Sequence, residues 1–149
     1  MRFSFVMCAL LSVATSQQQA YDAILRKDGV VLAGKFQEAC FNNIDPVFRP
    51  ILNPIVAAIR YSENGTPGRE YGILHKRVKP TYRSQAGWCA ATVQKNFTRW
   101  LNTNPTDKTT LSFIQFLGSR YCPVGADNDP NGLNQHWVKN VYHFYYEFK

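Results

Sequence analysis

The strongest pattern in the sequence is a helical repeat between Ser84 and Leu101. Its polar side carries Lys95 and Arg99, and its apolar positions recur every three or four residues at Ala86, Cys89, Val93, Phe97, Trp100 and Leu101. This spacing is typical of a helix that buries one face in a core. No segment alternates apolar and polar residues as a half-buried strand does. The sequence therefore predicts a compact, mostly α domain.

A second helix is predicted to begin at Pro54 and to end at Glu63. Proline fits the first turn of a helix, and Ile55, Val56 and Ile59 fall on one side of the segment. The Asn64-Gly65 pair that follows is a typical helix stop. Glu63 would therefore be the last residue of an apolar helix.

Three shorter helices are predicted in the rest of the chain. One lies around Gly34–Phe41, after the turn signal Asp28-Gly29. The next is capped by Asp107, Thr109 or Thr110 and ended by Gly118. The last one carries Trp137, Val138, Val141, Tyr145 and Phe148 on one face. Residues 64–80 are expected to form an irregular basic loop or a small hairpin, and residues 120–132 a second loop.

The first 16 residues are predicted to be a signal peptide. Arg2 precedes the apolar run Phe3–Ala14, which is shorter than the roughly 20 residues of a membrane-spanning helix. Small residues at Ala14 and Ser16 fit cleavage after Ser16, which leaves residues 17–149 as a single domain. The alternatives are a buried N-terminal helix or an uncleaved anchor. We expect a secreted or periplasmic protein that contacts a membrane only through this segment.

Cleavage would leave three cysteines, Cys40, Cys89 and Cys122. An odd number in an exported protein predicts one disulfide and one free thiol, and the small neighbours of Cys89 predict that it is buried. The spacing is not that of a zinc site, and no local pattern pairs a cysteine with a histidine. We expect neither a metal nor a cofactor.

The composition favours an anionic or ring-shaped partner. The formal net charge is +7, and 14% of the residues are aromatic. Cations attract phosphates and carboxylates, while flat rings stack on bases or sugar faces. Nucleic acids, membrane surfaces and glycans all remain open on these grounds.

Glu63 is the most informative of the ten acids. It would lie at a helix end beside a glycine-rich turn, where a ligand can approach closely. Partial burial and the negative end of the helix dipole would both raise the pKa of its carboxyl. A carboxyl that stays protonated near neutral pH can act as a general acid. The alternative is a solvated residue after a helix.

Two neighbouring segments, AIRYSENG (58–65) and GREYGIL (68–74), carry a family resemblance. Together with the later YRSQAGWCAATV and FIQFLGSRYCPVGADNDPNGLNQHWVKNV, they resemble the lysozyme-like superfamily, in particular soluble lytic transglycosylases and phage endolysins, over roughly residues 55–142. The resemblance implies a lysozyme-like helical fold with Glu63 as the catalytic acid. It also implies that Gly72-Ile73-Leu74 flanks the sugar cleft, although His75 stands where those enzymes commonly have Gln.

Glu70 is the nearest candidate for a second catalytic acid. Retaining glycosidases need two carboxyls about 5–5.5 Å apart, and inverting ones need about 6.5–9.5 Å. A lytic transglycosylase needs only one, because the 6-hydroxyl of the sugar attacks. The small number of acids favours chemistry with one carboxylate, and Glu70 would then pair with a basic residue of its loop.

Substrate binding is assigned to residues that lie near these motifs in the sequence: Tyr71, Gly72, Tyr82, Tyr121 and Asn134. Trp88 and Trp137 are expected to be core residues. The basic segment His75-Lys76-Arg77, with Lys79, is expected to attract the anionic groups of peptidoglycan.

Residues 127–132, Asp-Asn-Asp-Pro-Asn-Gly, match the opening of a calcium-binding loop. The twelfth position, which needs a bidentate glutamate, is Val138. We therefore expect a multiple turn around Asp127 and Asp129 in place of a calcium site.

These observations lead to one main hypothesis and two alternatives. The main hypothesis is a monomeric enzyme that cleaves peptidoglycan glycan strands, as a lytic transglycosylase or a muramidase. The first alternative is a non-catalytic cell-wall or glycan-binding module of the same fold. The second is a nuclease that uses His75 and His136, but the sequence has no phosphate-cradling or base-reading motif, so no specific nucleic acid is expected as a partner.

Overall fold

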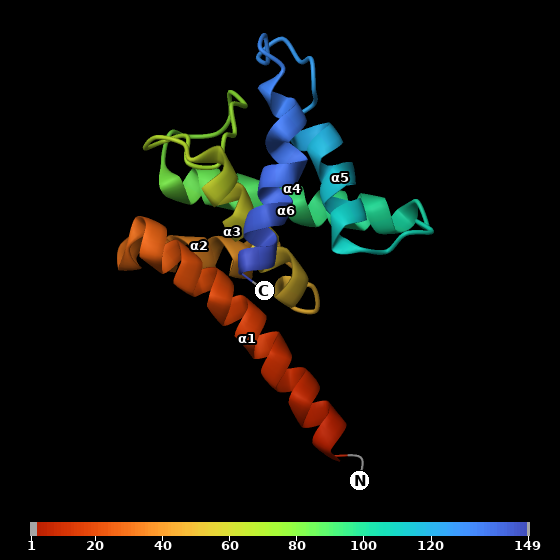
Figure 1. The fold of residues 1–149 in the computed structure, drawn as a ribbon. Coiled ribbons are helices and arrows are strands. Elements are labelled where there is room, and N and C mark those ends of the chain that lie inside the picture. Colours follow the sequence, from red (N-terminus) through yellow and green to blue (C-terminus); the bar gives the residue numbers. More distant parts are fainter. Residues whose placement is uncertain (1–2, 149) are drawn as a thin grey trace.

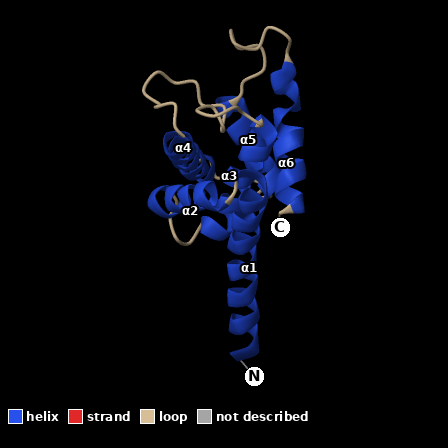
Figure 2. Cartoon of the chain, turned by 90° about the vertical axis from the view of Figure 1, so that its left-hand side faces the viewer, coloured by secondary structure: helices blue, strands red, loops and turns tan. Residues whose placement is uncertain are grey.

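A computed structural model describes residues 3–148, and their side chains from Ser16 onward. The described chain forms six α-helices and one short 3₁₀-helix, and contains no strand (Figures 1 and 2). The elements are α1 (Phe3–Asp28), α2 (Val30–Asn43), α3 (Arg49–Glu63), α4 (Tyr82–Asn102), α5 (Thr110–Tyr121), the 3₁₀-helix η1 (Leu133–His136) and α6 (Trp137–Glu147). The predicted mostly α fold is confirmed, and residues 64–80 form a loop, not a hairpin.

Helix α3 is the centre of the fold. It packs against α1, α2, α4 and α6, and every residue from Leu52 to Arg60 is buried. The sequence pattern indicated burial on one side only, because it shows which residues are apolar and not how many helices surround them. A helix enclosed on all sides can leave the core only at its ends.

The two ends of α3 were predicted with different success. The helix begins at Arg49, with Pro50 in its first turn, and Pro54 lies inside it. The predicted start at Pro54 is therefore wrong by more than a turn. A proline inside a helix removes one backbone hydrogen bond, but the surrounding core keeps this segment helical. The predicted end is confirmed: Glu63 is the last residue, and Asn64 takes the left-handed conformation with φ 45°.

A buried ion pair joins α1 to α3. Arg60 donates from Nη2 to Oδ1 of Asp28 at 2.7 Å and from Nε to Oδ2 at 2.9 Å. The two side chains are only 9% and 5% exposed. The Tyr82 hydroxyl donates to the same carboxylate at 3.0 Å, which adds α4 to the network. The C-terminal end of α3 is therefore fixed relative to two other helices.

The remaining helices lie close to their predicted places. Helix α4 exceeds its predicted range by two residues at the start and one at the end, and Thr109 caps α5 by accepting a hydrogen bond from the Ser112 backbone at 3.2 Å. Gly118 was expected to end α5, but the helix continues to Tyr121. It is buried inside the helix, where an added Cβ would lie 2.7 Å from Val138, so glycine here allows α5 and α6 to approach closely.

The expected disulfide does not form. Cys40, Cys89 and Cys122 are all free thiols, and the first two are buried. They come from α2, α4 and the residue after α5. The first two pack as small apolar side chains of the core, as was expected for Cys89.

The predicted signal peptide, residues 1–16, lies almost entirely outside the described side chains. The backbone of residues 3–16 continues into the rest of α1, and the side chains of Ala20, Ala23 and Ile24 belong to the core. The part of α1 after the predicted cleavage point is therefore part of the fold. Within the described residues, no helix is long and apolar enough to span a bilayer.

Replacing Arg60 by Met should lower the free energy of unfolding by about 3–5 kcal/mol, because it leaves the buried Asp28 carboxylate without its charge partner. The matched control is Arg83→Met. Arg83 pairs with Glu38 at 3.2 Å with both side chains exposed, so its loss should cost less than about 1 kcal/mol. Urea denaturation of both variants checks this, and equal losses would contradict it.

Candidate active site

A cavity of about 300 Å³ opens where the two long loops meet the end of α3. Both loops lie at the same end of the molecule in Figures 1 and 2. The cavity is lined by Glu63, Gly65, Thr66, Arg69, Gly72, Leu74, Tyr121, Cys122, Pro123, Asn128 and Asn134. We call it the Glu63 cavity. It brings together four of the predicted site residues: Glu63, Gly72, Tyr121 and Asn134.

The carboxyl group of Glu63 is partly buried in the wall of this cavity. The indole Nε1–H of Trp137 donates a hydrogen bond to its Oε1 at 2.8 Å. Burial raises the pKa of the Glu63 carboxyl, and the hydrogen bond from Trp137 offsets part of this increase. The sequence-based prediction of a raised pKa agrees with this environment. The group can therefore hold a proton at a higher pH than a solvated glutamate.

Gly72 provides the space that the Glu63 carboxyl occupies. An added Cβ at Gly72 would lie 2.6 Å from Cδ of Glu63, and the residue has φ +68°. The positive φ favours glycine, and a side chain here would displace the Glu63 carboxyl from its position. Gln85 on α4 holds this turn in place: its Oε1 accepts from the backbone N–H of Tyr71 and Ile73, and its Nε2 donates to the carbonyl of Ile73 at 2.8 Å.

An aromatic pair lies beside Glu63. Tyr121, at the end of α5, stacks on Trp137 at the start of α6, with ring centroids 5.3 Å apart and an interplanar angle of 27°. The Tyr121 hydroxyl donates to the carbonyl of Tyr71 at 2.6 Å. Tyr121 lines the cavity, and its hydroxyl connects α5 to the loop that carries Gly72.

Asp129 organises the second loop. Its Oδ1 accepts from the backbone N–H of Asn134 at 3.2 Å, and its Oδ2 accepts from the backbone N–H of Gly125 at 3.3 Å. Asn134 itself donates from Nδ2 to the carbonyl of Pro123 at 2.8 Å. The predicted multiple turn is confirmed around Asp129. Asn134 is also a brace of the loop that lines the cavity.

Three predicted site residues lie elsewhere. Tyr71 and Tyr82 are 0% and 5% exposed, and their hydroxyls are 3.0 Å apart in the core. The expectation that their rings bind substrate is therefore corrected, because neither presents a face to a ligand. Glu70 is 6% exposed, and its Oε1 accepts from the backbone N–H of Gly68 at 2.9 Å. It shapes the loop and does not line the Glu63 cavity, and it has no ion pair with Lys or Arg among the described residues.

A second hollow of about 330 Å³ continues past Arg69 and Leu74, which line both. Its lining includes His75 and Lys76. His75 stacks on Trp88, with ring centroids 5.3 Å apart and an interplanar angle of 23°. Trp88 is 39% exposed and so is not the core residue that was expected. The two hollows share Arg69 and Leu74, and Glu63 lines only the first of them.

Cys122 also lines the Glu63 cavity but is poorly suited to act as a nucleophile. Burial raises the pKa of its thiol to about 11, and the nearby carboxylates of Glu63 and Asp129 contribute in the same direction. A thiol of this pKa carries almost no thiolate near neutral pH. Of the two titratable groups, the Glu63 carboxyl is therefore the better candidate for chemistry in this cavity.

Sequence reasoning missed the residues that position Glu63. Trp137 was expected in the core, and it is 5% exposed, but its indole also holds the Glu63 carboxyl. Gln85 and the Arg60–Asp28 pair were not singled out. A buried polar residue inside an apolar helical face, such as Gln85, is the signal that could have identified a bracing role.

Comparisons with protein-family models, with curated proteins and with solved structures found no match. The function is therefore inferred from the residues around Glu63 and from the charge of the surface beside them.

Replacing Gly72 by Ala should lower the free energy of unfolding by about 1–3 kcal/mol more than replacing Gly125 by Ala. Both glycines have positive φ, +68° and +76°, but an added Cβ meets Glu63 at Gly72 and no atom within 4 Å at Gly125. The difference between the two variants in a denaturation experiment isolates the contact with Glu63. Equal destabilisation would contradict a fixed position of the Glu63 carboxyl in this space.

Replacing Trp137 by Phe should raise the pKa of Glu63 further, because it removes the hydrogen-bond donor that favours the ionised carboxylate. The pKa can be followed by ¹³C NMR of the glutamate carboxyl groups. Trp88→Phe, which changes the ring that stacks on His75, is the control and should leave the pKa of Glu63 unchanged. A lower pKa in the Trp137 variant would be inconsistent with the hydrogen bond.

Proposed function

We propose that the protein cleaves the glycan strands of peptidoglycan, with Glu63 as the general acid and base. The observation that carries this proposal is the environment of Glu63: a partly buried carboxyl with a raised pKa, facing a cavity large enough for a sugar unit. A carboxyl with a raised pKa stays protonated up to a higher pH than a solvated glutamate, and a protonated carboxyl can protonate a glycosidic oxygen. The aromatic wall formed by Tyr121 suits the apolar face of a sugar ring.

The lining of the cavity favours chemistry with a single carboxylate. Among the described residues that line it, Glu63 is the one acid. Glu63 would donate its proton to the glycosidic oxygen as the bond from that oxygen to C1 breaks. The 6-hydroxyl of the same sugar would then attack C1, and Glu63 would take back the hydroxyl proton. One C–O bond is broken and one is formed, so no water or cofactor is consumed.

The surface charge supports an anionic polymer as the substrate. Arg69, His75 and Lys76 line the hollow beside the Glu63 cavity, and the chain has a formal net charge of +7. Peptidoglycan carries carboxylates, which this surface would attract. If the predicted signal peptide is cleaved after Ser16, the chain would be exported to the compartment that holds this polymer.

The finer fold assignment belongs to the same proposal. A buried helix that ends in Glu63, followed by a glycine turn that contacts its carboxyl, supports the resemblance to the lysozyme-like superfamily. The general helical architecture alone would not support this resemblance, because one fold can serve many functions.

Replacing Glu63 by Gln should reduce the release of soluble muropeptides from purified sacculi by at least about a hundredfold, because an amide cannot donate a proton to the glycosidic oxygen. Glu38→Gln, at an exposed surface position, is the matched control and should retain wild-type release. The same release should decline as the pH rises through the pKa of Glu63, since only the protonated carboxyl acts as an acid.

Two results would contradict this function. Unchanged release by Glu63→Gln would remove the carboxyl from the mechanism. Wild-type protein that binds sacculi but releases nothing would favour the non-catalytic binding module.

A further inference from the structure

The hollow beside the Glu63 cavity carries positive charge that the residues around it do not balance. Its volume is about 330 Å³, and it shares Arg69 and Leu74 with the Glu63 cavity. Arg69 and Lys76 are exposed in its lining, and neither forms an ion pair among the described residues. No acidic residue lines it. We call it the basic hollow. Like charges in one hollow repel each other, and a bound anion would offset this repulsion.

The rest of the loop adds to the positive charge. Residues 69–83 contain five Lys or Arg residues and a single acid, Glu70. Glu70 is buried, and its Oε1 accepts from the backbone N–H of Gly68 at 2.9 Å. Arg83 pairs with Glu38. The other four cations of the segment have no carboxylate partner among the described residues.

His75 adds a hydrogen-bond donor to the same lining. Its Nδ1 accepts from the backbone N–H of Arg77 at 3.2 Å, so the proton of the neutral ring lies on Nε2. Nε2 has no hydrogen-bond partner among the described residues, and stacking on Trp88 holds the ring in place. The basic hollow therefore combines an imidazole N–H with two cations. Donors of this kind form strong, charge-assisted hydrogen bonds with carboxylates.

An apolar surface lies beside these donors. Ile73, Leu74, Val78 and Pro80 also line the basic hollow, and Leu74 is 57% exposed. The best ligand would therefore combine carboxylates with small apolar side chains, as an acidic peptide does. A nucleic acid also carries anions, but its bases need free ring faces, and the indole of Trp88 already stacks on His75.

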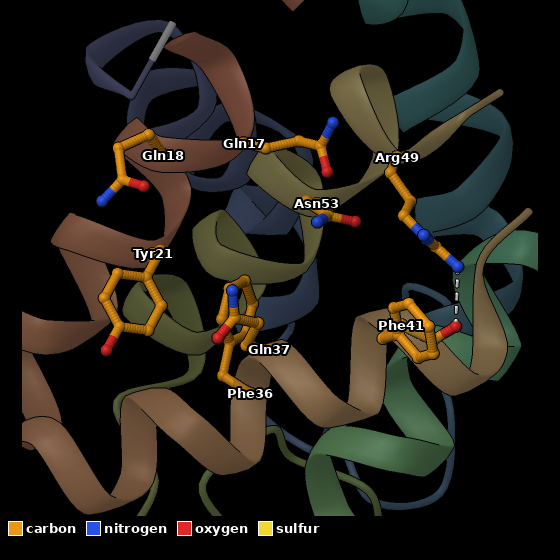
Figure 3. Close-up of a pocket in the computed structure, with 8 residues that line it drawn as sticks. All are labelled: Gln17, Gln18, Tyr21, Phe36, Gln37, Phe41, Arg49 and Asn53. Carbon is orange, nitrogen blue, oxygen red and sulfur yellow. Dashed lines mark hydrogen bonds between the residues drawn. The ribbon is translucent and has the colours of Figure 1, made fainter. Parts of the chain in front are cut away.

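A hollow of similar size between α1, α2 and α3 shows the opposite case (Figure 3). Its volume is about 310 Å³, and its one cation is Arg49. Arg49 donates to the carbonyls of Phe41 at 2.9 Å and Ile44 at 3.1 Å, and its guanidinium lies 4.5 Å from the centroid of the Phe41 ring. The protein itself satisfies this cation, so the hollow calls for no anion. The basic hollow differs because its cations have no such partners.

We propose that the basic hollow binds carboxylates of a peptidoglycan stem peptide while a sugar of the same strand occupies the Glu63 cavity. In peptidoglycan every second sugar carries a short acidic peptide, so one of the two sugars that flank any cleaved bond carries one. An extended peptide advances about 3.3–3.6 Å per residue, so a few residues reach from one hollow into the next. This inference rests on the function proposed above. It makes Arg69 and Lys76 determinants of specificity for strands that carry peptides.

The first test compares the cleavage of two soluble substrates: glycan strands that carry stem peptides, and the same strands after an amidase has removed the peptides. The wild type should cleave the peptide-bearing strands with a kcat/KM at least about tenfold higher, because the carboxylates gain hydrogen bonds to charged groups. The double variant Arg69→Gln/Lys76→Gln should reduce this preference to less than about twofold. Lys95→Gln/Arg99→Gln, at exposed positions of α4, changes the net charge equally and should keep the preference.

The second test is an NMR titration of the full-length protein and needs no cleavage. It follows the His75 ring and the Trp88 indole signals. The probes are a free stem peptide, the same peptide with its carboxylates converted to amides, and a short DNA oligonucleotide as a second source of anions. We expect saturable shifts with the acidic peptide, and shifts at least about tenfold weaker with the other two probes.

The proposal is overturned if bare and peptide-bearing strands are cleaved equally fast, or if the α4 control loses the preference as the double variant does. It is also overturned if the amidated peptide or the oligonucleotide binds as tightly as the acidic peptide. Its failure is separable from that of the catalytic proposal. Saturable binding of the acidic peptide without cleavage of either strand would overturn the catalysis alone. Glu63-dependent cleavage of both strands at equal rates would overturn the peptide site alone.

Discussion

The enclosure of α3 determines where chemistry can occur in this protein. Because α1, α2, α4 and α6 cover the helix, its side chains from Leu52 to Arg60 are buried. Glu63, one turn beyond Arg60, lies where the helix emerges between two loops. The buried Arg60–Asp28 pair fixes that end of the helix, so the carboxyl of Glu63 has a defined position relative to the loops.

The properties of Glu63 come from residues that are distant in the sequence. Trp137 lies 74 positions away and supplies the hydrogen bond, while Gly72 leaves the space in which the carboxyl fits. Gln85 holds the Gly72 turn against α4, and Tyr121 links that turn to α5. Partial burial raises the pKa of the carboxyl, and the single donor only partly opposes it. The same contacts that close the fold would therefore also prepare Glu63 for the proton transfer that we propose.

The sequence predicted those features that local patterns control. Glu63 as a helix end followed from Asn64-Gly65, and the limits of α4 followed from its apolar period. Features that depend on contacts between distant elements were missed. Gly118 looked like a helix stop, but it serves the close packing of α5 on α6, and Pro54 looked like a helix start although the core keeps it inside α3. Tyr71 and Tyr82 were assigned to the site because they are near it in sequence, yet their burial places them beneath it. The hydrogen bond between Trp137 and Glu63 has no local signature.

The central claim is that one carboxyl group, Glu63, carries out the whole reaction. Mass spectrometry of the ends of the glycan fragments released from purified sacculi tests this most directly. Attack by the 6-hydroxyl leaves a 1,6-anhydro end and consumes no water, and this is the result that the account predicts. Reducing ends that acquire ¹⁸O from labelled water would show that water is the nucleophile. This result would contradict the mechanism in which Glu63 acts alone and the 6-hydroxyl of the sugar attacks.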